Sequence, residues 1–176
     1  DPAVHARVLT ALASAARLRN TRPTGDLSGV GKFLNSDDRA IHTAAVHLVG
    51  AWKQVPQVPA LLMIAAGGDH AAFDSLVIIR GRKVVQGLKQ LAGEDKSIAT
   101  RQAAACALGA INLKSSLGEI FAVLKATEDA NAALELWRGL LGGRGAGKLL
   151  AGGVAGAELP KPIVTAGIRA AREGGR

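Results

Sequence analysis

Residues 95–128, DKSIATRQAAACALGAINLKSSLGEIFAVLKATE, contain two apolar-periodic segments separated by a short polar turn. In the first segment, residues 98–111, apolar side chains recur every three or four positions, which is the period of an α-helix. The turn, residues 112–116, leads into a second periodic segment at residues 117–124. The many alanines of the first segment favour close approach between helices. The stretch therefore predicts one helical hairpin.

The same hairpin pattern recurs along the chain. Residues 42–52, HTAAVHLVGAW, align with residues 101–111, RQAAACALGAI, and this alignment pairs Gly50 with Gly109. In the other units we place Ala13, Gly81, Gly139 and Gly167 at this landmark position, and successive landmarks are 28 to 37 residues apart. A two-helix unit of about 30 residues cannot bury its apolar face alone and stacks on its neighbours. The predicted fold class is all-α, an α-solenoid.

The solenoid is expected to form one array over residues 1–176, with about five and a half hairpins. Their approximate ranges are 1–35, 36–67, 68–93, 94–127, 128–157 and 158–176. The last range holds only a first helix, so we expect its apolar face to be covered in a longer parent protein. The start at Asp1-Pro2 without methionine also suggests a piece of a longer chain.

Composition agrees with closely packed helices. Hydrophobic residues make up 48% of the chain but aromatic residues only 3%, so Ala, Leu, Val and Gly provide the packing. No apolar run approaches the roughly 18 residues that cross a bilayer, and we expect no membrane insertion. The single cysteine, Cys106, excludes an intrachain disulfide and a haem-attachment motif within these residues.

Acidic and basic residues alternate along the predicted hairpins, with an acid before each first helix and a base at or near the turn that follows it. The acids are Asp1, Asp37, Asp38, Asp69, Asp95, Asp129 and Glu158, and the bases are Arg17, Lys53, Arg82, Lys83, Lys114, Arg144 and Arg172. We take helix-dipole complementarity as the main cause of this order. In a stacked array the bases would also form a ridge able to bind an anionic polymer or an acidic partner.

No catalytic, cofactor-binding or metal-binding residue is predicted. Residues 142–149, GGRGAGKL, fit a phosphate-binding loop except at Leu149, but a helical pattern rather than a strand precedes them. His42 and His47 are five residues apart, which does not fit a metal pair on one helix face. Cys106 is expected to be a small buried residue, and Trp52 and Trp137 packing residues, with an exposed tryptophan as a partner anchor the alternative.

Two segments, SDDRAIHTAAVHLVGAWK (residues 36–53) and EDKSIATRQAAACALGAI (residues 94–111), resemble HEAT repeats of the short, bilin-lyase-like kind. The shared features are an acid at the start, alanines in mid-helix and Gly-Ala near the end. An arginine midway along the first helix is typical of these repeats. It is present here as Arg101 and, more loosely, Arg39, but is absent from the third and fifth repeats. The resemblance implies a scaffold fold and no particular function.

The C-terminal part, LELWRGLLGGRGAGKLLAGG (residues 134–153) and LPKPIVTAGIRAAREGGR (residues 159–176), resembles the HEAT segment of large dehydrogenase-like proteins of the planctomycete type. In that family the array lies between a β-propeller and a c-type cytochrome module. The resemblance implies an extracytoplasmic spacer in a redox protein whose chemistry belongs to other domains.

The resulting hypothesis is a non-catalytic protein-interaction scaffold that binds a protein partner or the neighbouring domains of its parent chain. The expected contact residues are those of the basic ridge: Lys53, Arg82, Lys83, Lys114 and Arg144. The alternative is a nucleic-acid-binding solenoid that uses the same ridge, although the chain has few aromatics to stack on bases.

Overall fold

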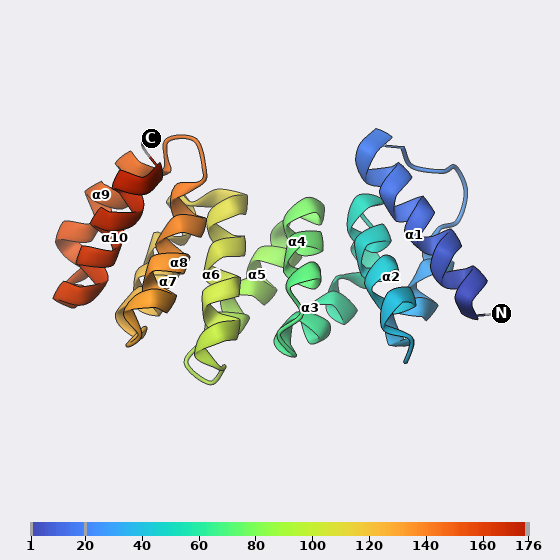
Figure 1. The fold of residues 1–176 in the computed structure, drawn as a ribbon, viewed down its shortest axis with the longest axis horizontal. Helices are drawn as coiled ribbons and strands as arrows, with labels where there is room; N and C mark the ends of the chain where they lie inside the picture. The colour runs from blue at the N-terminus through green and yellow to red at the C-terminus, as the bar shows by residue number, and fades with distance from the viewer. Residues whose placement is uncertain (1, 20, 175–176) are drawn as a thin grey trace. The chain divides into compact units, whose positions relative to one another are not determined.

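The computed structural model describes residues 2–19 and 21–174, and in this part of the chain all regular structure is helical. The α-helices are α1 Pro2–Arg19, α2 Arg39–Ala51, α3 Val58–Ala66, α4 His70–Ile79, α5 Arg82–Leu91, α6 Ile98–Asn112, α7 Leu117–Lys125, α8 Ala130–Leu141, α9 Ala146–Ala157 and α10 Lys161–Gly174. Three 3-10 segments accompany them: η1 Ser28–Asn35, η2 Val55–Gln57 and η3 Lys114–Ser116 (Figure 1). The predicted all-α class is confirmed.

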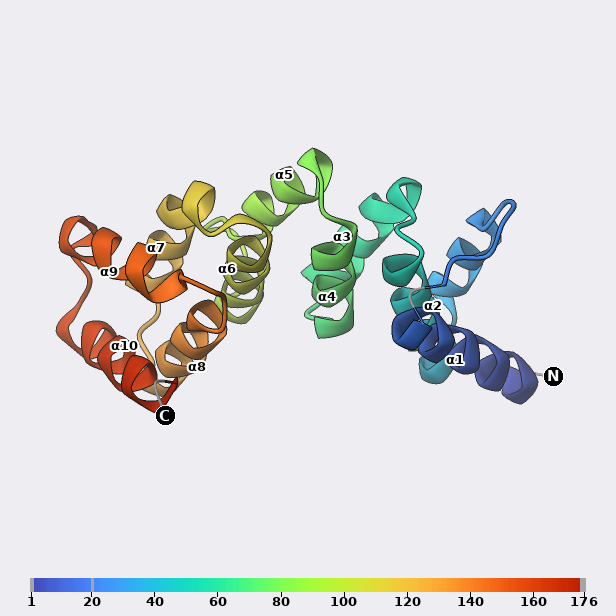
Figure 2. The ribbon, with the colours of Figure 1, turned by 90° about the horizontal axis from the view of Figure 1, so that it is seen from above.

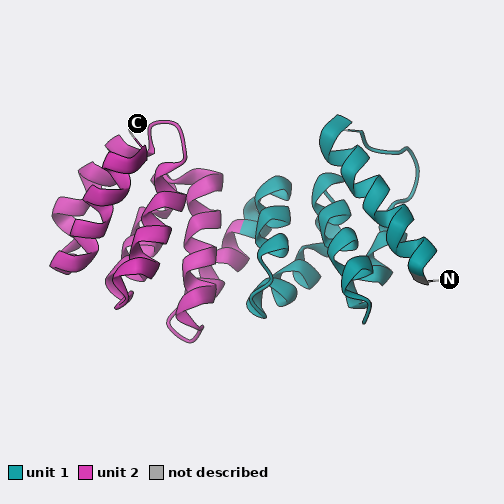
Figure 3. Cartoon of the chain, viewed as in Figure 1, with its two compact units in different colours: residues 1–84 teal, residues 85–176 magenta. Residues whose placement is uncertain are grey.

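The chain divides into two compact units, Asp1–Val84 and Val85–Arg176 (Figure 3). The boundary falls within α5, the second helix of the third predicted hairpin. Each unit is described separately below. The single array over residues 1–176 stays a prediction.

The first unit consists of two helical layers. Helices α1, α2 and α4 pack side by side in one layer, with α2 in the middle. In the other layer, η1 packs against α2 and α3 packs against α4 (Figure 2). The longer helices thus form one layer and the shorter elements the other.

The second unit repeats this arrangement. Helix α8 packs between α6 and α10 in one layer, and α7 packs against α6 and α9 in the other (Figure 2). The most extensive of these helix contacts is that between α8 and α10. Glycine and alanine permit it, since an added Cβ at Gly167 of α10 would lie 2.8 Å from Cε2 of Trp137 in α8.

Short polar side chains begin four of the longer helices. The carboxylate of Asp38 accepts hydrogen bonds from the N–H groups of Ala40 and Ile41, at 2.8 and 3.2 Å. Asp69 and Asp129 cap α4 and α8 in the same way. These caps satisfy amide groups that have no partner within the helix. Their negative charge also interacts favourably with the partial positive charge at the N-terminus of the helix. The dipole interpretation of the acids therefore holds at these three positions.

Two acids do not have the position that helix capping requires. The cap of α6 is the hydroxyl of Ser97, which accepts from the Thr100 N–H at 3.2 Å, whereas Asp95 pairs with Lys96. Glu158 ends α9 with a left-handed backbone instead of beginning α10. The expectation for Asp1 lies outside the described residues. A capping side chain must directly precede the first turn, and only Ser97 does so at α6.

The landmark assigned to Gly81 is wrong. Gly50 and Gly109 lie inside α2 and α6 and face a neighbouring helix, but α4 already ends at Ile79. Gly81 follows that end with a φ of +97° and has no heavy atom within 4 Å of an added Cβ. Its role is the left-handed turn into α5, which glycine adopts without steric strain.

The element that follows α1 in the chain is the 3-10 helix η1, not the α-helix expected at residues 27–34. Asp26 precedes it as predicted, but its carboxylate accepts from the N–H and hydroxyl of Ser28, at 2.8 and 3.0 Å, in a tight local turn. The segment SGVGKFLN contains two glycines, whose low helix propensity disfavours a regular α-helix.

Arg101 is one of the few charged side chains buried in the described core. Its Nε donates to the carbonyl oxygen of Ala92, just after the end of α5, at 3.2 Å. This bond satisfies a carbonyl at the helix end that has no partner in the helix. Arg101 lies in the first turn of α6, not midway along the helix, and it connects α6 to the chain segment that precedes it.

Candidate interaction surfaces

The five predicted contact residues all lie in or beside turns and are exposed. In the first unit, Lys53 follows α2, and Arg82 and Lys83 are the first residues of α5. In the second unit, Lys114 belongs to η3 and Arg144 to the turn between α8 and α9. Among the described residues, no ion pair includes any of the five. They are therefore free to meet an anionic partner.

The helix dipole does not explain all of these positions. Arg82 and Lys83 lie at the N-terminus of α5, where the partial positive charge of the helix repels cations. Lys53 has a φ of +50°, a backbone conformation that non-glycine residues rarely adopt. The helix dipole therefore does not account for Arg82 and Lys83, whereas Lys53, Lys114 and Arg144 follow the C-terminal ends of α2, α6 and α8, where it favours cations.

In the glycine-rich segment 142–149, residues 142–145 form the turn between α8 and α9, and residues 146–149 form the first turn of α9. It begins after α8, so the strand that a phosphate-binding loop requires is replaced by a helix. Gly145 has a φ of +75° and directly precedes α9. The glycines therefore serve the reversal of the chain, as the sequence predicts.

A groove with a volume of about 730 Å³ lies between α1 and α2. We call it the α1–α2 groove. Its lining consists of Thr10, Ala13, Ser14, Arg17 and Leu18 from α1, and of Arg39, Ala40, Thr43, Ala44 and His47 from α2. The buried alanines Ala13 and Ala44 belong to it, together with basic and hydroxyl side chains. No acidic residue lines it.

A smaller groove of about 430 Å³ lies between α8 and α10. Its lining is Ala130, Asn131, Leu134, Lys161, Pro162, Thr165, Ala166 and Arg169. It again combines bases, a threonine and alanines without an acid. None of the residues that line either groove is among the five predicted contact residues. One wall of each groove has the same sequence pattern, which starts at a base, Arg39 in α2 or Lys161 in α10. A threonine follows four residues later, an alanine five residues later, and a histidine or arginine eight residues later.

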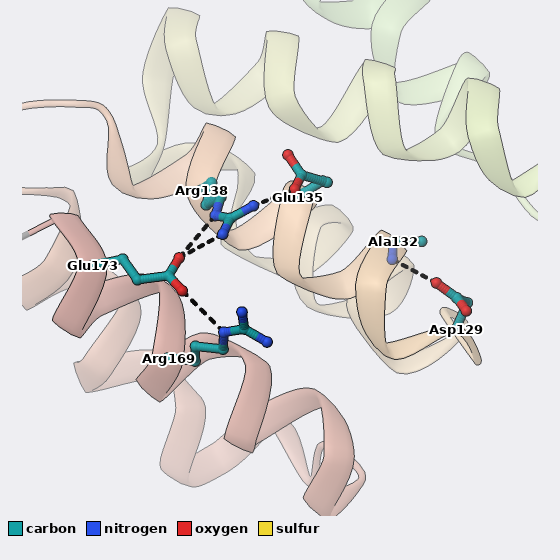
Figure 4. Close-up of polar contacts among 6 residues, drawn as sticks. All are labelled: Asp129, Ala132, Glu135, Arg138, Arg169 and Glu173. Atoms are coloured by element: carbon teal, nitrogen blue, oxygen red, sulfur yellow. Dashed lines mark hydrogen bonds and ion pairs between the residues drawn. The ribbon is translucent and has the colours of Figure 1, made fainter.

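The helices that form the smaller groove are joined by exposed charges (Figure 4). The guanidinium of Arg138 on α8 bonds both Glu135 and Glu173, and its Nη2 lies 2.6 Å from Oε2 of Glu173. Arg169 Nε donates to the other oxygen of Glu173 at 2.9 Å. The hydrogen bonds from Arg138 and then Arg169 lower the pKa of Glu173 below its ordinary value. Arg169 is thus already neutralised by a carboxylate.

The histidines make local contacts. His42 Nδ1 lies 2.7 Å from the carbonyl oxygen of Leu34, and its Nε2 lies 3.6 Å from a carboxylate oxygen of Asp69. The ring of His5 lies 6.1 Å from that of Phe33. Over residues 2–19 and 21–174, no three His, Cys, Asp or Glu side chains come together in a way that could hold a metal ion.

Both tryptophans are buried packing residues, so the alternative of an exposed aromatic anchor is wrong. Trp52 is 6% exposed and Trp137 is 3% exposed. The indole Nε1 of Trp137 donates to the carbonyl oxygen of Ile163 at 2.9 Å and so joins α8 to α10.

We expect Cys106 to react slowly with thiol reagents at neutral pH. Cys106 is half-buried, not fully buried as expected from the sequence, and this burial raises the pKa of its thiol to about 11, so the reactive thiolate is scarce below that pH. Its Sγ also packs against the backbone of α8, since an added Cβ at Gly139 would lie 2.8 Å from it. Iodoacetamide labelling followed by mass spectrometry should be far slower for the folded protein at pH 7 than for the denatured control at the same pH. Labelling as fast as that of free cysteine would contradict this burial.

The chain matches no protein-family model, no curated protein and no solved structure. In the described part of the chain, no helix combines the length and the apolar character needed to span a membrane. A functional assignment therefore rests on the surfaces of the chain itself.

Proposed function

We propose that this chain is a non-catalytic protein-interaction scaffold, built as an α-solenoid of HEAT-like hairpins. The supporting observation is the layer of longer helices in each unit, which leaves grooves lined by basic side chains between neighbouring helices. Surfaces of this type suit extended peptides and partner helices. In a longer chain the array would serve as spacer and docking surface, and any redox chemistry would belong to neighbouring domains.

The candidate contact residues at the turns are Lys53, Arg82, Lys83, Lys114 and Arg144. Their support is exposure without an ion pair in the described structure. Exposed cations of this kind attract acidic partners over the range of the Debye length. They would add to association rate and orientation more than to affinity.

The alternative, a nucleic-acid-binding solenoid, is favoured by the same turns and by the net charge of +8. Proteins that bind single strands or displaced bases stack them on exposed aromatic side chains. Here Trp52, Phe73 and Trp137 are buried, and Phe33 and Phe121 are only partly exposed. A contact with phosphates alone would be weak and strongly dependent on salt.

Two binding measurements separate these functions. Selection of a random peptide library on the immobilised chain, followed by calorimetry, is expected to yield peptides that bind at physiological salt. Anisotropy of a labelled duplex of about 20 base pairs is expected to show weak binding that disappears at that salt. The variant Arg82→Glu, Lys83→Glu, Lys114→Glu, Arg144→Glu serves as the comparison in both.

Failure to select any binding peptide would overturn the scaffold proposal. Duplex binding that persists at physiological salt and is lost in the four-residue variant would replace it with the nucleic-acid alternative. Peptide binding that is unchanged in the variant would remove the turns from the contact surface and leave the scaffold function.

A further inference from the structure

We propose that the α1–α2 groove binds an acidic peptide in extended conformation, with two carboxylates that occupy opposite ends of the groove. This inference rests on the proposed scaffold function and names the chemistry of the partner. The main contact surface is then the layer of long helices in the first unit, and not the basic turns expected from the sequence.

The two charged residues that line the groove, Arg17 and Arg39, are both positive, and the imidazole of His47 lies beside them. In the described structure none of these three side chains takes part in an ion pair. The nearest acid in the chain, Asp38, directs an oxygen to the amides of Ala40 and Ile41 and is not among the lining residues. A guanidinium donates two parallel hydrogen bonds to the oxygens of a carboxylate. The groove is thus complementary to anions.

Distance along the groove selects an extended chain. Arg39 and His47 are eight residues apart on α2, which at 1.5 Å per residue separates them by about 12 Å. In an extended peptide, side chains at positions i and i+4 point to the same side and are separated by about 13 Å. Two acidic residues with three residues between them would therefore reach Arg39 at one end and His47 with Arg17 at the other.

The middle of the groove fits the peptide between those acids. Thr10, Ser14 and Thr43 supply hydroxyl groups that can donate to or accept from a peptide backbone. The alanines Ala13 and Ala44 are 6% and 4% exposed, so they offer a low apolar floor beneath small side chains. No aromatic residue lines the groove, which removes the stacking that single-stranded nucleic acid uses.

The pattern on α2 recurs on α10 in the second unit. Counted from the first residue of each helix, the same pattern occurs at Arg39, Thr43, Ala44 and His47 and at Lys161, Thr165, Ala166 and Arg169. Each set lines a groove against the preceding long helix. Packing alone does not demand this pattern, because the corresponding positions of α6 are Ile98, Gln102, Ala103 and Cys106. In the second groove Arg169 already binds Glu173, so the α1–α2 groove is the stronger candidate.

The test uses a fluorescein-labelled peptide, Gly-Ser-Glu-Ala-Ser-Ala-Glu-Gly, and a matched peptide in which both Glu are Gln. Anisotropy should show that the Glu peptide binds about two- to thirtyfold more tightly, since each of its two carboxylates would form an exposed ion pair. The double variant Arg39→Glu, Arg17→Gln should lose this difference. Glu at the first residue of α2 is compatible with the helix dipole, and circular dichroism checks that the variant is folded.

The matched control is Arg22→Glu, Lys32→Gln, which makes the same change of charge in the same unit at two exposed bases outside the groove. It is expected to bind the Glu peptide within about twofold of the unchanged protein, because long-range attraction is screened at physiological salt. Equal loss in both variants would show a general charge effect and overturn the groove. Loss in the control alone would place the peptide outside the groove, overturn the groove proposal and leave the scaffold function intact.

Two further outcomes distinguish the proposals. If library selection yields peptides that bind but neither acidic content nor the groove variant affects them, the groove proposal fails and the scaffold function stands. If a DNA duplex displaces the Glu peptide at physiological salt and loses affinity in the groove variant, the groove is a nucleic-acid site and the peptide proposal fails.

Discussion

Replacement of Gly50 with alanine is expected to lower the free energy of unfolding by about 1–3 kcal/mol, the usual effect of excess volume in a packed core. Gly50 lies in α2 where α4 crosses it. An added Cβ would lie 2.6 Å from Oγ and 2.8 Å from Cα of Ser75. The Cα atom belongs to the backbone and cannot rotate away, so the two helices must separate. Urea denaturation followed by circular dichroism measures the loss.

The separation would also disturb a buried hydrogen bond. The Ser75 hydroxyl donates to the carbonyl oxygen of Val46 in α2 at 2.9 Å, and Ser75 is 1% exposed. The matched control is Gly152→Ala in α9, where an added Cβ has no heavy atom within 4 Å. It is expected to stabilise by about 0.4–1 kcal/mol, since alanine loses less entropy in a helix. A stabilising Gly50→Ala would contradict the close approach of α2 and α4.

Replacement of Trp137 with alanine is expected to destabilise by about 3–5 kcal/mol. The indole is 3% exposed and lies against Gly167 of α10, where no larger residue fits without a shift. Its removal leaves a cavity and removes the hydrogen bond from the indole to the Ile163 carbonyl oxygen. The contact between α8 and α10 should loosen as a result. Trp52, the other tryptophan, reports separately on the first unit by fluorescence.

Trp137→Phe separates the hydrogen bond from the packing. It retains an aromatic ring and should cause a smaller loss than alanine, of about 1–3 kcal/mol, because the smaller ring leaves a void and the hydrogen bond to Ile163 is lost. Arg138→Ala is the control at the next residue. Its exposed ion pairs with Glu135 and Glu173 contribute little in water, so its effect should be far smaller than either tryptophan change. Equal effects at both positions would show that charge, not burial, joins α8 to α10.

Much of the helical structure follows from local sequence. The periodic segment 98–111 corresponds to α6, which ends one residue later, at Asn112. Asp38, Asp69 and Asp129 cap helices where the sequence indicates, because a cap depends only on residues within one turn. Asp95 and Gly81 were misassigned because alignment of spacing does not reveal where a helix begins and ends. Ser97 and the end of α4 at Ile79 decide those positions.

The exposed turns were also predictable, since polar runs between apolar segments lie at the surface. The α1–α2 groove was not, because its two walls are about 30 residues apart in the chain and their register depends on how two helices cross. The base-Thr-Ala pattern of α2 and α10 is visible in the sequence, but only packing shows that both copies face a groove. The sequence by itself determined the helices, their caps and their turns, which are local. Tertiary structure alone decided which glycines permit contact between helices and which bases line a groove, because both depend on atoms brought close by folding.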